Sequence, residues 1–183
     1  LTNAINLADG EDGLITSIFM IFLIIFFLRN QEPMNDFYLS LIFSCLFFLI
    51  YNVKGLIFLG NSGSYLVGGL MSFILIQCYN FSFLPIEEIF LLLYLYGIDM
   101  LRVYIERILR GIHPFTAEKN HLHHYIFKFS KNKKINLFIY LILLYFPFIV
   151  SLTYKNYFIL IFLTFSIYLF ALFFFKKNGM KTA

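Results

Sequence analysis

Residues 57–69 read IFLGNSGSYLVGG, a stretch of glycines, serines and one asparagine that leads from an apolar run at 37–51 into another at 64–84. The stretch either joins two membrane helices or forms a binding site for a charged group. Which interpretation applies depends first on whether the chain lies in a membrane or in water. Hydrophobic residues make up 61% of the 183 residues, charged residues make up 13%, and the mean hydropathy is +0.82. Such a chain has too little polar surface to cover a water-soluble globule, so the composition predicts a membrane protein.

Six apolar runs have lengths that suit a bilayer. They lie at 14–28, 37–51, 64–84, 86–101, 135–152 and 157–175. A spanning helix needs about 20 residues, so the shorter runs must extend into flanking polar residues. Cys45 and Cys78 lie within these runs without the spacing of a disulfide or zinc motif, and we expect both to be buried as small hydrophobic residues. We predict an all-α, polytopic integral membrane protein with about six transmembrane helices and a single domain over residues 1–183.

The basic residues test this threading, because helices that span in sequence must alternate in direction. With the N-terminus on one side, that side receives twelve of the 14 Lys and Arg residues, and the other side receives only Arg29 and Lys155. Basic residues concentrate in cytoplasmic loops, so both termini are expected in the cytoplasm. The polar segments 1–13, 52–64 and 102–134 then all face the cytoplasm, where we expect the function to lie.

The first polar segment reads NAINLADGEDGL (3–14) and spaces Asn3, Asn6, Asp9 and Asp12 by threes. On a helical or near-helical path this spacing projects the four side chains toward neighbouring points. Helix capping is the alternative interpretation, since Asp and Asn cap the N–H groups of a following helix. Capping accounts for one such residue, so the set of four favours a functional role.

The second polar segment includes most of the glycine-rich turn at residues 57–69. Gly60 and Gly63 allow close backbone approach, and Asn61, Ser62 or Ser64 can cap the third span. A helix that starts at the cytoplasmic side points its N–H groups at the cytoplasm, where they favour an anion such as phosphate. A plain structural turn stays open as the alternative.

The third segment reads RVYIERILRGIHPFTAEKNHLHHYIFK (102–128). Helical spacing predicts a structural ladder of charges along one helix face; its members are Asp99, Arg102, Glu106 and Arg110. Arg110, Gly111 and Pro114 are expected to end this helix. A loop then leads to three histidines, His121, His123 and His124, for which we consider hydrogen bonding to a phosphorylated substrate, a solvated loop, or zinc or nickel binding.

These three segments, in this order and separated by spanning helices, resemble membrane phosphotransferases that move a sugar 1-phosphate from a UDP-sugar to a polyprenyl phosphate. The segments are NAINLADGEDGL, IFLGNSGSYLVGG and HPFTAEKNHLHH. The histidine segment is more similar to the bacterial UDP-N-acetylhexosamine 1-phosphate transferases of glycosyltransferase family 4, which start cell-surface polysaccharides, than to the phospho-MurNAc-pentapeptide transferase. The resemblance covers residues 1 to about 128 and implies release of UMP, with Mg²⁺ as the cofactor, at the cytoplasmic face of a bacterial plasma membrane.

The resemblance also implies roles for single residues. Asn6 would be a metal-side ligand, and Asp9 and Asp12 would serve the nucleotide and the reacting centre. The remaining substrate-binding residues would be Asn3, Arg107, His121, His123 and His124. The partners expected are the UDP-sugar, polyprenyl phosphate and membrane lipid, without nucleic acid, and a homodimer stays open.

The chain departs from the family pattern in two places. The family has a metal-binding Asp at the position of Asn61, and an amide removes a charge that a hard cation prefers. The paired aspartates of the family would precede residue 1, so we expect the chain to be the C-terminal part of a longer transferase. Two alternatives follow: a catalytically inactive relative of the same fold, and a membrane transporter, which would need ionisable residues or broken helices near the bilayer midplane.

Overall fold

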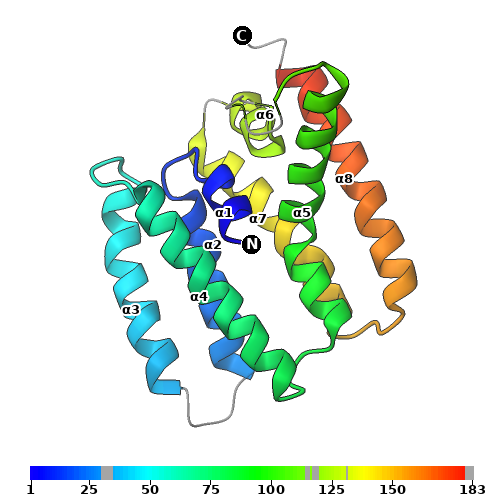
Figure 1. The fold of residues 1–183 in the computed structure, drawn as a ribbon. Helices are drawn as coiled ribbons and strands as arrows, with labels where there is room; N and C mark the ends of the chain where they lie inside the picture. The colour runs from blue at the N-terminus through cyan, green and yellow to red at the C-terminus, as the bar shows by residue number, and fades with distance from the viewer. Residues whose placement is uncertain (30–34, 114–115, 117–119, 131, 180–183) are drawn as a thin grey trace. The chain divides into compact units, whose positions relative to one another are not determined.

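The computed structural model describes residues 1–29, 35–113, 116, 120–130 and 132–179, and within these ranges the chain is helical without a β-strand (Figure 1). The chain divides into two compact units, Leu1–Phe83 and Leu84–Ala183. The described residues of each unit form four helices. The prediction of one domain over the whole chain stays a prediction.

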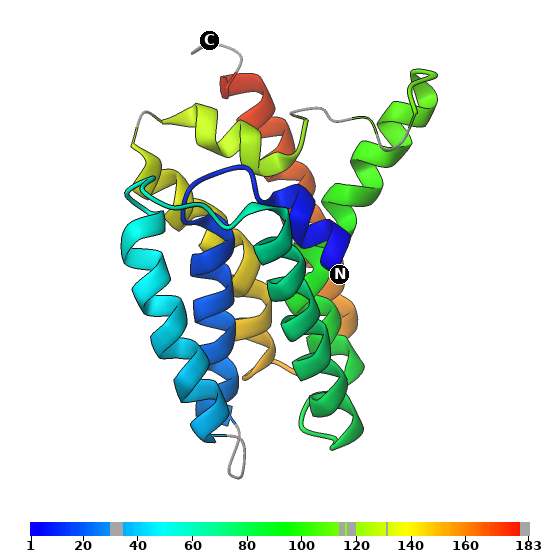
Figure 2. The ribbon, with the colours of Figure 1, turned by 60° about the vertical axis from the view of Figure 1, so that its left-hand side comes forward.

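The first unit contains α1 (Thr2–Ala8), α2 (Leu14–Arg29), α3 (Asn35–Asn52) and α4 (Gly60–Asn80). The apolar helix α2 packs against α3 along its length, and the short helix α1 lies against α4 (Figure 2). The core of this unit is formed largely by α2, on which Leu14, Ile18 and Phe22 are almost completely buried. Both native cysteines are buried, as expected, and neither forms a disulfide.

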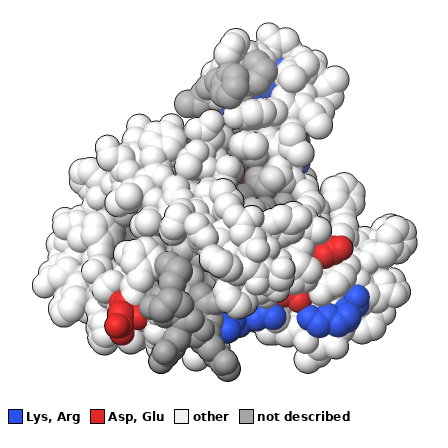
Figure 3. Space-filling model, turned by 60° about the horizontal axis from the view of Figure 1, so that its bottom comes forward, with Lys and Arg blue, Asp and Glu red and all other residues white. Residues whose placement is uncertain are grey.

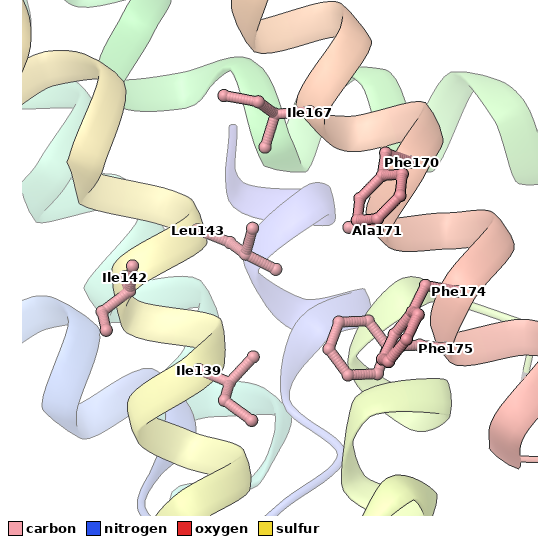
Figure 4. Close-up of a pocket in the computed structure, with 8 residues that line it drawn as sticks. All are labelled: Ile139, Ile142, Leu143, Ile167, Phe170, Ala171, Phe174 and Phe175. Atoms are coloured by element: carbon pink, nitrogen blue, oxygen red, sulfur yellow. The ribbon is translucent and has the colours of Figure 1, made fainter.

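The second unit contains α5 (Ile86–Leu109), α6 (Leu122–Phe129), α7 (Lys133–Ser151) and α8 (Tyr157–Gly179). Helix α5 packs against α7 and α8, and the short helix α6 contacts the same two helices. The Tyr94 hydroxyl of α5 donates a hydrogen bond to the backbone carbonyl of Leu143 in α7. A cavity of about 290 Å³ lies between α7 and α8 (Figure 4). Only apolar side chains line it: Ile139, Ile142, Leu143, Ile167, Phe170, Ala171, Phe174 and Phe175.

Each of the six predicted apolar runs overlaps a helix, although α4 begins and ends four residues before the predicted run and α5 continues eight residues beyond it. Four helices of the described residues, α3, α4, α7 and α8, are long and apolar enough to cross a membrane, and α2 is a shorter apolar helix. Helix α5 does not meet these limits, and it carries Glu87 and Glu88 in its first turn. On the face that Figure 3 shows, most of the surface is uncharged. The helices and their composition confirm a polytopic membrane protein, whereas a crossing by α2 and α5, and the direction of every helix, stay predictions.

Two glycines end helices in the same way. Gly55 follows α3 and Gly111 follows α5, and both adopt positive φ, at 68° and 69°. After α5, the N–H of Ile112 donates to the Arg107 carbonyl at 2.9 Å, and that of Gly111 donates to the Ile108 carbonyl at 3.0 Å. This pair of bonds is a Schellman motif, in which the left-handed residue satisfies the last carbonyls of the helix. The predicted stop at Arg110 and Gly111 is therefore confirmed, while Pro114 lies outside the described residues.

Candidate functional site

The first two polar segments meet within the first unit, where α1 lies against α4. The Ser64 hydroxyl donates a hydrogen bond to the Asp9 carboxylate. One residue further along α4, the Tyr65 hydroxyl lies 3.5 Å from the Asn6 amide nitrogen. Residues more than 50 positions apart in the sequence thus form one polar group, as the motifs had suggested.

A glycine of α4 makes this approach possible. A Cβ atom at Gly68 would lie 2.7 Å from the Cα atom of Thr2, so no larger residue fits without a shift of α1. Asn3 and Asn6 follow Thr2 on α1, with Asn3 exposed and Asn6 partly buried, and Asp9 is the C-cap residue of the helix. The near-helical path predicted for this segment is confirmed up to Asp9.

Asp12 lies in the connection between α1 and α2 and is exposed. Its carboxylate lies over Gly55, since a Cβ atom added to that glycine would be 3.3 Å from Asp12 Oδ2. The loop that follows α3 therefore passes close to the acidic end of the first segment.

Asn52 fixes this connection, and the sequence did not single it out. Its side-chain oxygen accepts hydrogen bonds from the Gly13 N–H at 3.0 Å and from the Thr16 hydroxyl at 2.8 Å. Its amide nitrogen donates to the Ile57 carbonyl at 2.8 Å. Asn52 is buried, so it joins the start of α2 to the loop before α4. The one sequence signal was a polar residue directly after an apolar run.

The environment of Asp9 changes its acidity. Burial raises the pKa of this carboxyl above 3.8, the hydrogen bond from Ser64 lowers it, and the charge of Asp12 raises it again. The net direction is upward, because removing a carboxylate from water disfavours its charged form.

The prediction of a side-chain cap on the third span is wrong. Helix α4 begins at Gly60 after Leu59, and no side chain caps its first turn. Asn61 and Ser62 are exposed in that first turn, whereas Ser64 is buried and turned to Asp9. The glycine-rich stretch is therefore mostly the start of the helix and not a loop before it.

The second unit holds the third polar segment. The predicted charge ladder on α5 is confirmed: Arg102 pairs with Asp99 at 2.8 Å and with Glu106 at 2.9 Å. Arg110 Nη2 lies 3.4 Å from Glu106 Oε2. Arg107 is buried on the same helix, and it is one of the substrate-binding residues that we predicted.

The three histidines form one aromatic group. The rings of His121 and His123 are nearly parallel with centroids 5.7 Å apart, and those of His123 and His124 are 4.0 Å apart. His121 and His123 are buried, so the alternative of a solvated loop is wrong for these two. Burial, with the neighbouring His124 and His121, lowers the pKa of His123 to about 3.

Two of the three histidines lie in a helix and not in a loop. His121 precedes the first turn of α6, which contains His123 and His124. Part of the connection that leads to them, residues 114, 115 and 117–119, lies outside the described residues. In the part of the chain that is described, no group of three or more His, Cys, Asp or Glu side chains is arranged to hold a metal ion. Zinc or nickel binding by the histidines thus gains no support.

The chain is similar to curated bacterial transferases. It is 31% identical over 146 residues to the phospho-N-acetylmuramoyl-pentapeptide-transferase of Carboxydothermus hydrogenoformans, a match that covers 74% of this chain and 43% of the relative. It is 27% identical over 138 residues to the undecaprenyl-phosphate alpha-N-acetylglucosaminyl 1-phosphate transferase of Escherichia coli K12, covering 69% of this chain and 37% of the relative. A 76-residue match to the Staphylococcus carnosus pentapeptide-transferase is 37% identical and covers 39% of this chain and 24% of the relative.

The chain spans less than half the length of these relatives. No match was found among the solved structures. The family model of glycosyl transferase family 4 matches residues 1–79, the part that contains Asn6, Asp9 and Ser64. Together with the relatives, which extend the similarity into the second unit, this match identifies the chain as a member of glycosyl transferase family 4.

Proposed function

We propose that this chain carries part of the active site of a transferase that moves an N-acetylhexosamine 1-phosphate from a UDP-sugar to undecaprenyl phosphate. The observation that supports the proposal most is the polar group of Asp9, Ser64, Asn6 and Tyr65. This group joins two sequence segments of the family at one end of the helices of the first unit. In the proposal, this end faces the cytoplasm of a bacterium, at the plasma membrane.

The proposed reaction is a phosphoryl transfer. An oxygen of the polyprenyl phosphate attacks the β-phosphorus of the UDP-sugar, and the bond from that phosphorus to the oxygen bridging the two phosphates breaks. UMP leaves, and the sugar stays on the lipid through a new pyrophosphate. Such reactions depend on the positioning of the reactants and on stabilising negative charge. Asp9 and Asp12 are assigned to the reacting centre. Arg107, His121, His123 and His124 are assigned to sugar-nucleotide binding.

The donor set of the first unit fits Mg²⁺ in its chemistry. Asn6, Asp9 and Asp12 each offer a side-chain oxygen atom, the kind of ligand that this hard cation takes. Asn6 Oδ1 is buried and accepts no hydrogen bond from the described residues, so an acceptor is left for a cation. Asn61, in the exposed first turn of α4, is the fourth member of the proposed set. When bound, Mg²⁺ would neutralise charge on the pyrophosphate.

The test uses membranes that contain the full-length protein. They are incubated with UDP-N-acetylglucosamine labelled in the sugar, undecaprenyl phosphate and Mg²⁺, and the lipid extract is counted. The expected result is labelled lipid for the wild type and a large loss for Asp9→Asn, with Glu106→Gln as a control on the other unit. Absence of labelled lipid with every UDP-sugar supplied would count against the proposal.

The amide of Asn61 favours a second candidate function, in which the chain is a catalytically inactive relative of the transferases. An amide at a position where the resembling family has a carboxylate supplies one neutral oxygen to a cation. If the wild type is inactive and Asn61→Asp restores Mg²⁺-dependent transfer, the amide alone has silenced the site. If both proteins transfer the sugar phosphate, and Asn61→Asp merely lowers the Mg²⁺ concentration needed, the inactive alternative is excluded.

A further inference from the structure

Asp99 of the second unit does more than begin a charge ladder. One of its carboxylate oxygens accepts hydrogen bonds from Arg102 Nη2 at 2.8 Å and from the Tyr168 hydroxyl at 2.9 Å. The other oxygen lies 2.9 Å from His121 Nδ1. The backbone N–H of Leu122 completes the set, at 3.1 and 3.2 Å from the two oxygens. Asp99 therefore joins α5 and α8 to the first residue of the histidine group.

These contacts assign the protons of His121. An Asp paired with Arg102 is ionised and can only accept hydrogen bonds, so the proton of the contact belongs to His121 Nδ1. In the neutral imidazole only one ring nitrogen carries a proton, so a proton on Nδ1 facing Asp99 leaves the lone pair on Nε2.

Nε2 of His121 has nothing to bind within the described part of the unit. The atom is buried, and no hydrogen-bond partner for it lies among the described residues. The residue as a whole is 5% exposed. A buried acceptor that lacks a partner costs free energy in the protein alone, and a substrate group that donates a hydrogen bond would recover that cost.

We infer that Asp99 is a positioning residue, which holds His121 in the Nδ1–H tautomer so that Nε2 accepts a hydrogen bond from the sugar nucleotide. This inference rests on the proposed function for the identity of the ligand. It specifies the contact further: the group bound at Nε2 is a hydroxyl or an amide N–H, because an unprotonated nitrogen cannot donate to a phosphate oxygen. The second histidine fits the same chemistry, since buried His123 Nε2 also lacks a partner among the described residues.

The first experiment measures the tautomer and does not depend on activity. Full-length protein with ¹⁵N-labelled histidine rings is studied by NMR in lipid nanodiscs, and the His121 signals are assigned by their loss in His121→Asn. The expected wild-type spectrum has a protonated Nδ1 and an unprotonated Nε2. Asp99→Asn is expected to reverse the tautomer, because an amide can donate to Nδ1. Glu106→Gln neutralises the second acidic partner of Arg102 without changing Asp99 or His121, and should leave the tautomer unchanged.

The second experiment measures kcat/KM for UDP-N-acetylglucosamine. Asp99→Asn should lower it by about 10- to 100-fold, the range for partners that orient a histidine. His121→Asn keeps a donor for Asp99 but lacks Nε2, so it should lose at least as much. The double variant should be no worse than His121→Asn alone, because residues that act as one unit are not additive.

The outcomes separate this inference from the proposed function. A wild type without transfer activity defeats the proposed function, while the spectra still decide the tautomer. An unchanged tautomer in Asp99→Asn, or losses that multiply in the double variant, overturns the inference. If Asp99→Asn does not fold, Asp99→Glu replaces it. This variant keeps the negative charge beside Arg102 but changes the distance from the carboxylate to His121, so kcat/KM should still fall. Wild-type kinetics for Asp99→Glu would overturn the inference.

Discussion

Replacing Gly68 by alanine is expected to displace α1 from α4. The new Cβ atom would lie 2.7 Å from the Cα atom of Thr2, whereas ordinary contacts are 3.4–4 Å, so the two backbones must separate by about 1 Å. The obstacle is backbone, which cannot rotate away as a side chain can. Overpacking of this kind costs about 1–3 kcal/mol.

Gly69 provides the matched control. A Cβ atom at this position meets nothing within 4 Å. Both glycines lie inside α4, so both alanines gain the same helix propensity of about 1 kcal/mol. The difference between Gly68→Ala and Gly69→Ala therefore isolates the contact with α1, and should equal about 1–3 kcal/mol in the free energy of unfolding.

The assay is reversible unfolding of the full-length variants by a denaturing detergent, followed by helix content. Transfer activity is measured in parallel, because a displacement of about 1 Å in a positioning element can cost about 100-fold in rate. Gly69→Ala should keep wild-type activity, and Gly68→Ala should lose most of it. Equal stabilities and equal rates for the two variants would refute the packing of α1 on α4 through Gly68.

Three further predictions concern the first unit. Ser64→Ala should raise the pKa of Asp9 further and Asp12→Asn should lower it, which ¹³C NMR of labelled aspartate can measure; shifts in the same direction would contradict the account. Because folding raises the pKa of Asp9, its ionised form lowers stability at neutral pH, and this cost is relieved as the pH falls through the raised value toward 3.8. Asn52→Ala should lower the free energy of unfolding by about 3 kcal/mol, since three hydrogen bonds of about 1 kcal/mol each are lost. Thr16→Val removes only one of them and should cost about 1 kcal/mol, so equal losses would argue against the role given to Asn52.

The long elements of the fold could be predicted from the sequence because apolar runs of this length have few options in a bilayer, where backbone groups must be satisfied within a helix. The contacts from Asp99 to Arg102 and from Arg102 to Glu106 followed from helix geometry alone. The start of α4 at Gly60 did not, because glycine, asparagine and serine together are typical of a loop.

The spacing of residues in the sequence could not predict the tertiary contacts of the site. Asn52 bonds to residues 36 and 39 positions away, and Asp99 bonds to Tyr168, 69 positions away. Neither pairing leaves a periodic signal in the sequence. His121 and His123 looked like loop residues for the same reason: their burial depends on packing of α6 against α7 and α8, which only the structure provides.

In the proposed reaction a sugar 1-phosphate, and not a sugar alone, moves to the lipid. A UDP-N-acetylglucosamine labelled with ³²P at the β-phosphorus and with ¹⁴C in the uracil tests it directly in membranes that contain the full-length protein. The account predicts that ³²P enters the lipid fraction while ¹⁴C is recovered as UMP, and that Asp9→Asn abolishes both changes. Recovery of both labels together in UDP, or in unreacted substrate, would contradict it.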